Sequence, residues 1–125
     1  MKYLLDVNAL IAVIWTDHAS HATIESWIRE RALATCPLSE IGFLRISTNP
    51  KALGATMPDA RKLLEDFCSK HSVELVPADL PALKSLARKS EEVTDSYLAE
   101  LAASKATKLA TLDSGIVHAA AELIK

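Results

Sequence analysis

The chain has 125 residues, half of them hydrophobic and only 5% aromatic, and its formal net charge is −2. This length and apolar content predict one globular domain with an aliphatic core, and they exclude a disordered chain. The charge excludes a broad basic surface, so a nucleic-acid enzyme of this composition would need a local basic surface and a metal ion that offsets its own acids.

The first half of the chain alternates short apolar segments with helical patterns. In chain order, we predict a strand at Lys2–Asp6, helices at Asn8–Trp15 and Ser20–Arg31, a strand at Leu33–Cys36, and a helix capped by Ser39 that runs to about Ser47. Pro37 stops the second strand, and Pro50 follows the end of the last helix because the residue before a proline disfavours helical backbone.

The second half of the chain repeats this alternation. In chain order, we predict a helix from Pro58 to about Ser69, a strand at Val73–Val76, helices at Leu80–Lys89 and Thr94–Lys105, and a strand at Leu109–Thr111. The tail, 116–125, is either a helix or a last strand, since its periodicity fits both. Short strands separated by helices predict an α/β fold with a mostly parallel sheet of four or five strands.

Cysteine content and the N-terminal segment bear on the cellular location. Cys36 and Cys68 are too few for a disulfide framework, and both lie in apolar surroundings, so we expect buried, reduced thiols. The N-terminus does not read as a signal peptide, because Asp6 and Asn8 interrupt its apolar run. The apolar run at 9–15 is too short to span a bilayer. We therefore expect a soluble, cytoplasmic protein with no membrane partner.

Four acidic residues lie at the edges of apolar segments, and they are Asp6, Glu40, Asp95 and Asp113. Asp6 and Asp113 come directly after predicted strands, and the carboxyl ends of parallel strands meet at one edge of a sheet. Asp95 lies near a helix start, where the helix dipole stabilises a negative charge. The same residues have local alternatives, because Asp95 can serve as a helix cap and Glu40 as an ordinary first-turn charge.

Four carboxylates in one cleft would point to divalent-metal chemistry. Their repulsion would raise some of their pKa values unless a cation neutralises them. Mg²⁺ takes a few carboxylates and keeps several waters, and a deprotonated water of this kind can attack a phosphodiester. The chain shows no Ser/His/Asp arrangement, P-loop or zinc-ligand spacing that would favour another chemistry.

The segments around these acids resemble the signature of the PIN-domain family. The matching pieces are LDVNALI at 5–11, Glu40, VTDSYLAELA at 93–102 and LATLD at 109–113. The segment EIGFLRISTNP at 40–50 is similar to one large actinobacterial-type branch of this family. The resemblance covers essentially the whole chain, and its length and motif order match a VapC-type toxin, the ribonuclease of a toxin–antitoxin pair.

The resemblance implies a fold, an activity and a set of site residues. The fold would be an α/β/α sandwich formed as a single PIN domain over 1–125. The activity would be endoribonuclease cleavage of single-stranded RNA regions, with Mg²⁺ or Mn²⁺ as cofactor. The implied catalytic and metal-binding residues are Asp6, Glu40, Asp95 and Asp113.

Three further residues are candidates for supporting roles. Asn8 matches a frequent polar position near the metal, although it could instead cap the following helix. Thr111 matches a common threonine two residues before the last acid, although a strand threonine needs no function. Arg45 could contact RNA phosphate or brace the acids, and a surface ion pair is the equal alternative. Ser114 departs from the family pattern, because many relatives carry a basic residue there, and this weakens a phosphate contact at that point.

The resemblance also implies partners. A cognate VapB-type antitoxin would occupy a groove near the apolar first helices, and it would insert an arginine near the acids. A homodimer and a toxin–antitoxin hetero-oligomer would follow. Two other functions stay open, a non-catalytic PIN-type module that binds RNA or protein, and a phosphatase with Asp6 as nucleophile, which lacks the second aspartate that such a loop carries two positions on. The sequence names neither the RNA nor the number of metal ions.

Overall fold

The computed structural model describes residues 1–125, apart from the side chain of Lys84. Five strands form one sheet in the order β3-β2-β1-β4-β5, and all four neighbouring pairs are parallel. The strands are β1 (Lys2–Leu5), β2 (Ala32–Thr35), β3 (Glu74–Leu75), β4 (Lys108–Thr111) and β5 (Ala121–Leu123). The predicted α/β fold with a parallel sheet is confirmed.

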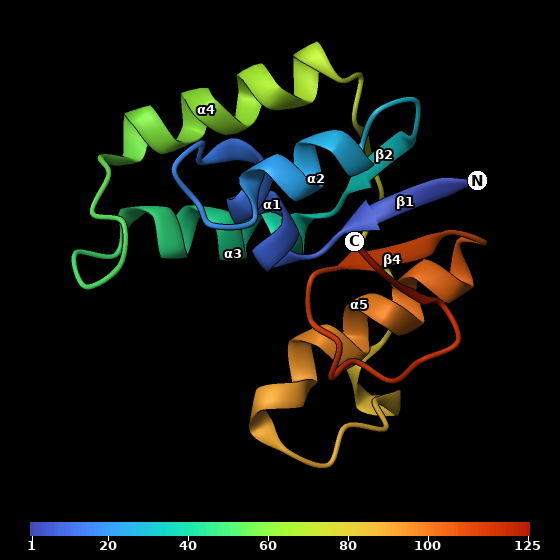
Figure 1. The fold of residues 1–125 in the computed structure, drawn as a ribbon. Helices are drawn as coiled ribbons and strands as arrows, with labels where there is room; N and C mark the ends of the chain where they lie inside the picture. Colours follow the sequence, from blue (N-terminus) through green and yellow to red (C-terminus); the bar gives the residue numbers. More distant parts are fainter.

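Helices cover both faces of this sheet (Figure 1). The helices are α1 (Val7–Ile14), α2 (His21–Trp27), α3 (Pro37–Thr48), α4 (Met57–Lys70) and α5 (Val93–Ser104), with short 3-10 turns η1 (Ala82–Lys84) and η2 (Ser90–Glu92) before α5. Residues of α1 to α4 share one core cluster, and residues of α5 belong to a second cluster on the opposite face. The layers therefore form the α/β/α sandwich that the resemblance implied.

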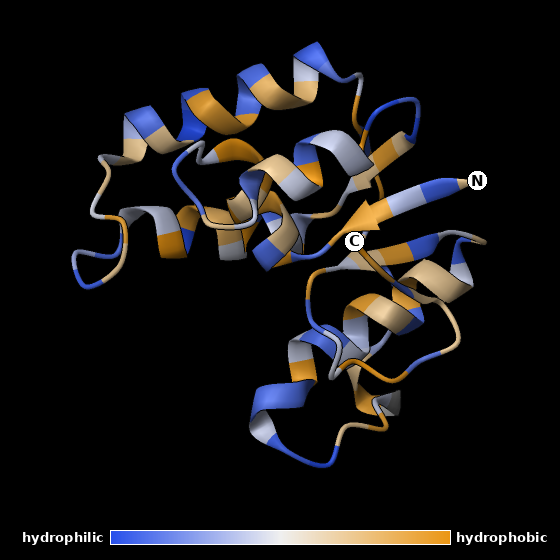
Figure 2. Cartoon of the chain, in the orientation of Figure 1, coloured by the Kyte–Doolittle hydropathy of each residue, from blue (hydrophilic) through white to orange (hydrophobic). Residues whose placement is uncertain are grey.

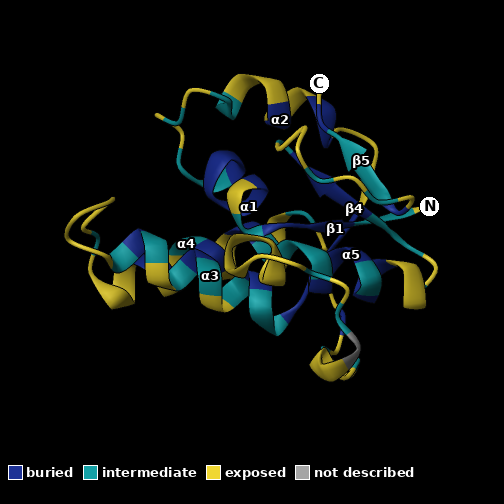
Figure 3. Cartoon of the chain, turned by 90° about the horizontal axis from the view of Figure 1, so that it is seen from below, coloured by how far each residue is buried: buried dark blue, intermediate teal, exposed yellow. Residues whose placement is uncertain are grey.

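Alternating strand residues divide the core between the two faces. Leu5 and Ala110 pack into the cluster of α1 to α4, whereas Leu4 and Leu109 pack into the cluster of α5. Because both faces are covered, β1 and β4 are apolar on both sides, as parallel strands usually are. Figures 2 and 3 show this as apolar, buried colours along β4 and the second half of β1.

The strand order creates a switch point between β1 and β4. After β1 the chain adds β2 and β3 on one side, then crosses back to add β4 and β5 on the other. Open parallel sheets bind their ligands at the carboxyl ends of the strands at such a point. The Asp6 amide donates a hydrogen bond to the Ala110 carbonyl at 3.2 Å, so the ends of β1 and β4 lie side by side.

The predicted helix at Leu80–Lys89 is wrong. Only the turn η1 forms there, and the side chains of Leu83 and Leu86 are 100% and 82% exposed. A short amphipathic segment stays helical in water only when a surface covers its apolar face, and here the rest of the chain provides none.

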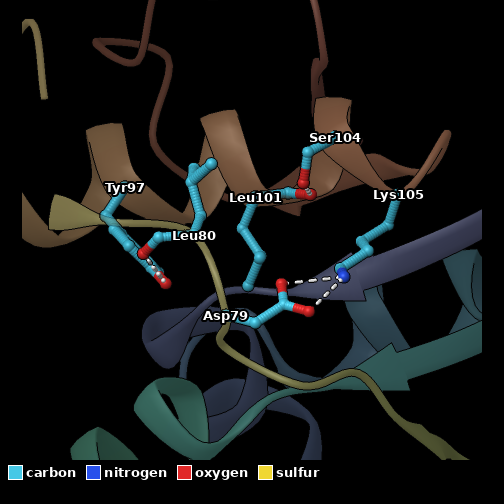
Figure 4. Close-up of polar contacts among 6 residues, drawn as sticks. All are labelled: Asp79, Leu80, Tyr97, Leu101, Ser104 and Lys105. Carbon is cyan, nitrogen blue, oxygen red and sulfur yellow. Dashed lines mark hydrogen bonds and ion pairs between the residues drawn. The ribbon is translucent and has the colours of Figure 1, made fainter. Parts of the chain in front are cut away.

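The segment before η1 is instead held against α5. The Tyr97 hydroxyl donates to the Leu80 carbonyl at 2.8 Å, and the Lys105 ammonium pairs with Asp79 at 2.8 Å (Figure 4). These contacts carry the chain across the second face of the sheet in an extended form. They leave the stretch from η1 to η2 as a loop beside the start of α5.

Two helix boundaries differ from the prediction by more than one residue, and the tail takes one of the two forms left open for it. Helix α2 ends at Trp27 rather than Arg31, and Glu30 adopts a positive φ of 64° where the chain turns toward β2. Helix α3 begins at Pro37, so Ser39 lies inside its first turn rather than at its cap. The tail forms a strand, Ala121–Leu123, because β4 offers it a free edge for parallel pairing.

None of the helices among the described residues has both the length and the apolar content needed to cross a membrane.

Candidate active site

Asp6 is a buried acid that caps a helix. It follows β1 directly, its residue is 2% exposed, and its Oδ1 accepts a hydrogen bond from the Ala9 amide at 2.7 Å at the start of α1. The pKa of Asp6 is raised to about 6, mainly by burial and also by the charges of Asp95 and Asp113, although hydrogen bonds from Thr111 and Ala9 oppose the rise. The end of β1 is thus followed by the Asp6 carboxylate, whose ionisation is opposed by its burial.

Asp113 and Thr111 lie on the neighbouring strand end. Thr111 is the buried last residue of β4, and its hydroxyl accepts a hydrogen bond from the Asp113 amide at 3.0 Å. The Asp113 carboxylate is exposed and accepts from the Gly115 amide at 2.8 Å. Thr111 therefore links the two acids, because the same side chain is a hydrogen-bond partner of Asp6.

Asp95 approaches from the other face of the sheet. It lies half-buried in the first turn of α5, as its sequence position predicted. Burial raises the pKa of Asp95, and the charge of Asp113 adds to this rise. The structure therefore brings three of the four predicted acids together, from β1, β4 and α5, within range of mutual repulsion.

Glu40 has a different environment. It lies half-buried in the first turn of α3, where burial raises its pKa, and its side chain lines a depression shared with Arg61 and Cys68 of α4. Its charge in turn raises the pKa of the Cys68 thiol. The neighbouring Ser39 hydroxyl donates to the Leu5 carbonyl at 2.9 Å, so this turn of α3 lies beside the end of β1 while the Glu40 side chain faces α4.

Asn8 and Arg45 are both exposed. Asp6, and not Asn8, caps α1, so the capping alternative for Asn8 is wrong. Arg45 lies in the last turn of α3, and among the residues that the structure describes it forms no ion pair, which contradicts the structural alternative for this residue. Neither side chain contacts the three grouped acids through a hydrogen bond between described residues.

A cavity of about 490 Å³ opens beside Asp95 and Asp113. It follows one side of α5 and is bounded by the loops before α5 and after β4. The described residues that line it besides the two acids are Leu86, Ala87, Glu91, Glu92, Ser96, Ala99, Glu100, Gly115, Ile116, Val117 and His118. Sequence reasoning missed the part played by the two loops, because it placed one in a helix and left the other undecided.

The three grouped acids offer hard oxygen ligands that suit Mg²⁺ or Mn²⁺. Among the described residues no three His, Cys, Asp or Glu side chains already lie close enough to enclose a metal ion. Mg²⁺ needs only one or two protein carboxylates, because it keeps several of its waters. The hydroxyl of Thr35, at the carboxyl end of β2, is buried and finds no partner among the described residues, so this edge of the sheet holds one unsatisfied polar group.

Comparisons with known proteins agree with this arrangement. The family model described as PIN domain matches residues 3–122. Ribonuclease VapC38 of Mycobacterium tuberculosis is 39% identical over 125 residues, which cover 90% of this chain and 86% of that protein. Ribonuclease VapC39 of the same species is 30% identical, with 96% and 94% covered. The crystal structure of VapBC2 from Rickettsia felis, bound to a DNA fragment from their promoter, superposes with a TM-score of 0.63 at 16% identity, covering 92% of this chain and 90% of that chain, and it shows the same fold.

Proposed function

Because the chain belongs to the PIN-domain family, we propose that it is a VapC-type endoribonuclease toxin of a toxin–antitoxin pair, formed as a single domain over 1–125. The observation that carries the proposal is the convergence of Asp6, Asp95 and Asp113 at the switch point of the sheet, where burial, together with the charge of Asp113, raises the pKa values of Asp6 and Asp95. Carboxylates whose negative charges oppose one another are suited to hold a divalent cation.

We infer Mg²⁺ or Mn²⁺ as the cofactor, held by these three acids. When bound, the ion would supply the activated water and the charge that stabilises the phosphorane-like transition state. The chain's own residues orient the ligands, since the Ala9 amide holds the Asp6 carboxylate and the Gly115 amide holds that of Asp113. Thr111 fixes the spacing between these two acids through its hydrogen bonds to both residues.

Glu40 is the fourth acid of the proposed set. Its side chain would have to turn from α4 toward the end of β1 to join the other three, and the turn of α3 that carries it already lies there. We therefore expect Glu40→Gln to lower the cleavage rate less than Asp95→Asn does. Equal losses in the two variants would show that Glu40 works inside the cluster.

A VapB-type antitoxin is the partner that we propose, together with a homodimer of this chain and a toxin–antitoxin hetero-oligomer. A groove of about 610 Å³ runs between α1, α2 and α4, and Ile14, Ile28 and Leu63 contribute its apolar lining. Co-purification of the chain with the product of the adjacent gene, followed by size-exclusion chromatography, tests the partnership. Loss of the complex in an Ile28→Glu protein that remains folded would support this groove, and an unchanged complex would exclude it.

Cleavage of a panel of structured RNAs by the purified chain tests the activity. The reactions contain Mg²⁺, Mn²⁺ or a chelator, and they compare the natural protein with Asp6→Asn and with Asp59→Asn. Asp59 is an exposed acid in the first turn of α4, so its variant controls for loss of a surface charge. We expect metal-dependent cutting that Asp6→Asn abolishes and Asp59→Asn retains.

The other outcomes decide between the remaining functions. RNA binding without cleavage, unchanged in Asp6→Asn, would mean that the chain is a binding module. A covalent phosphate on Asp6 after treatment with a phosphomonoester would favour the phosphatase. Cleavage that survives both the chelator and Asp6→Asn would contradict the proposed site.

A further inference from the structure

The cavity beside Asp95 and Asp113 extends beyond the acids that would carry out the cleavage. Its volume of about 490 Å³ is in the range of small-molecule sites and exceeds what a scissile phosphate alone would need. Two of its lining residues are apolar and almost fully open to solvent, Leu86 at 82% and Val117 at 94%. Exposed aliphatic side chains at the rim of a cavity are suited to cover the flat face of a planar ligand.

The polar lining favours hydrogen-bond donors in the ligand. Glu91 and Glu92 from η2 and Glu100 from α5 add three carboxylates to the two of the proposed active site. A further phosphate of the RNA backbone would be repelled here, because like charges oppose one another. The N–H groups of a nucleobase would be attracted, since a carboxylate accepts hydrogen bonds at base edges.

His118 supplies a donor in this acceptor-rich cavity. Its Nδ1 accepts a hydrogen bond from the Ala120 amide at 3.0 Å, so the neutral ring carries its proton on Nε2. The charged side chains that line the same cavity are Glu91, Glu92, Asp95, Glu100 and Asp113. His118 thus adds one N–H group to a cavity whose other ionisable lining groups among the described residues are acceptors.

We propose that this cavity binds one unpaired guanine of the RNA substrate, next to the scissile phosphate, with His118 as a specificity-determining donor. Guanine presents two adjacent N–H donors, N1–H and N2–H₂, which match a carboxylate, and its O6 and N7 acceptors match the Nε2–H of His118. Adenine and cytosine place one donor beside an acceptor, and uracil has a single N–H group between two carbonyls. The proposal rests on the proposed ribonuclease function.

The loop that follows β4 carries both Asp113 and His118. The loop 112–120 returns to the sheet through β5, and its fold places His118 in the cavity with Asp113. Substrate contact in this loop is therefore assigned to the Nε2 side of the His118 ring, because Nδ1 is occupied by the Ala120 amide.

Cleavage of single-stranded RNA oligonucleotides that differ at one position tests the proposal. The series places guanine, adenine, cytosine, uracil or hypoxanthine, which lacks the 2-amino group, on each side of the cleaved bond. We expect the natural protein to prefer guanine at one position by roughly 5- to 100-fold in kcat/KM, and hypoxanthine to lose part of that preference. Fluorescence anisotropy in chelator measures the binding of the same series to the Asp6→Asn protein. This readout does not require cleavage.

Variants of His118 separate recognition from folding. His118→Leu removes the donor, so the ratio of kcat/KM for guanine to kcat/KM for the other bases should fall to near one. His118→Gln keeps an N–H group and should keep most of the preference for guanine. His18→Leu is the matched control. His18 Nδ1 accepts a hydrogen bond from the amide of Ser20, two residues on, at 3.0 Å, which is the same kind of contact that His118 forms, and His18 does not line the cavity. Glu100→Gln should weaken the preference for guanine as well.

The remaining outcomes separate this inference from the function on which it rests. Cleavage without a base preference, or a preference that His118→Leu leaves unchanged, would overturn the guanine subsite and keep the ribonuclease. A loss of affinity in His118→Leu that is equal for all bases would overturn it in favour of a backbone contact. Failure of every oligonucleotide to be cut or bound would contradict the ribonuclease itself.

Discussion

Asp6 affects the stability of the fold in two opposite ways, because it stabilises the fold as a helix cap and destabilises it as a buried charge. As the cap of α1 it satisfies the Ala9 amide, and such a cap contributes about 1 kcal/mol. As a buried carboxylate it must ionise where burial holds its pKa at about 6 instead of 3.8, a difference that corresponds to about 3 kcal/mol at neutral pH. The acid most central to the proposed chemistry therefore lowers the stability of the metal-free chain.

We expect Asp6→Asn to be inactive and more stable than the natural protein. Asparagine keeps an oxygen for the Ala9 amide and removes the charge, so the free energy of unfolding should rise by about 1–3 kcal/mol at pH 7.5 in chelator. Asp6→Ala removes the charge and the cap, so it should gain less. Urea denaturation of the three proteins measures the differences, and a less stable Asp6→Asn would show that the buried charge is not a cost.

The same pKa predicts how this difference depends on pH. The folded pKa of Asp6 is raised above its unfolded value, so its contribution to stability is fully present below about pH 3.8 and is lost as the pH rises through about 6. The stability gap between Asp6→Asn and the natural protein should therefore widen from pH 4.5 to pH 7.5. Denaturation curves across this range check it, and a gap that narrows as the pH rises would contradict the assigned pKa.

Residue positions differed in how far the sequence could predict them. Asp6 and Asp113 were predictable because each follows an apolar strand, and parallel strand ends meet at one edge. The orientation of Glu40 was not, because position in a helical turn does not say which neighbouring helix the side chain will face. The donor role of His118 was not predictable either, since it depends on how the loop after β4 returns to the sheet.

At the scale of elements, helices α1 and α3 approach each other so closely at Gly42 that a larger residue there would overlap Val7. A Cβ atom at Gly42 would lie 2.4 Å from Val7 Cγ2, a methyl group on a stiff β-branched side chain. Gly42 is therefore required by the close approach of two helices, one of which is capped by Asp6. This approach also positions the turn of α3 that carries Glu40.

Gly42→Ala should lower the free energy of unfolding by about 1–3 kcal/mol, because the added methyl overlaps Val7 and pushes the helices apart. Val7→Ala removes the two methyl groups in question, so the double variant Val7→Ala/Gly42→Ala should recover part of the loss relative to Gly42→Ala. Thermal or urea denaturation of the four proteins gives the coupling energy. Additive effects of the two substitutions would show that overlap with Val7 does not cause the loss of stability in Gly42→Ala.

The elements that the sequence predicted well are those whose apolar face finds a partner. Helices α4 and α5 lie within a residue or two of their predicted ranges, and α4 packs on α3 and α1 whereas α5 packs on the sheet. The segment Leu80–Lys89 has helical spacing but no surface to cover it, so it stays a loop. Whether such a surface exists is a property of the whole fold and cannot be read from the segment.

For the whole molecule, the sequence predicted a parallel sheet but could not predict the order of its strands. Alternating strands and helices predict parallel pairing, but they fit several orders. Only tertiary packing places β4 beside β1 and so joins Asp113 to Asp6. The cluster of acids is thus a consequence of topology as much as of residue type.

Binding of a divalent ion to this cluster should stabilise the entire fold. At a concentration of Mg²⁺ or Mn²⁺ 100 times its dissociation constant, the gain would be about 2.7 kcal/mol, which corresponds to a rise in Tm on the order of 5–10 °C. Asp95→Asn should reduce this rise, whereas Asp59→Asn should keep it. Differential scanning calorimetry with and without the metal measures the effect, and equal rises in all three proteins would contradict a metal site at the acids.

The position of β1 at the centre of the sheet also governs when the site can exist during synthesis. β1 is the first strand to be translated and can pair with β2 early, but its other neighbour, β4, begins only at Lys108. Because a ribosome adds roughly 5–20 residues per second, the nascent chain spends most of its synthesis with Asp6 already made and Asp113 not yet joined to it. A nuclease built in this order cannot assemble its three acids until β4 and Asp113 have been added, so the ribosome that makes the chain is not exposed to the complete site while residues 1–107 are being synthesised.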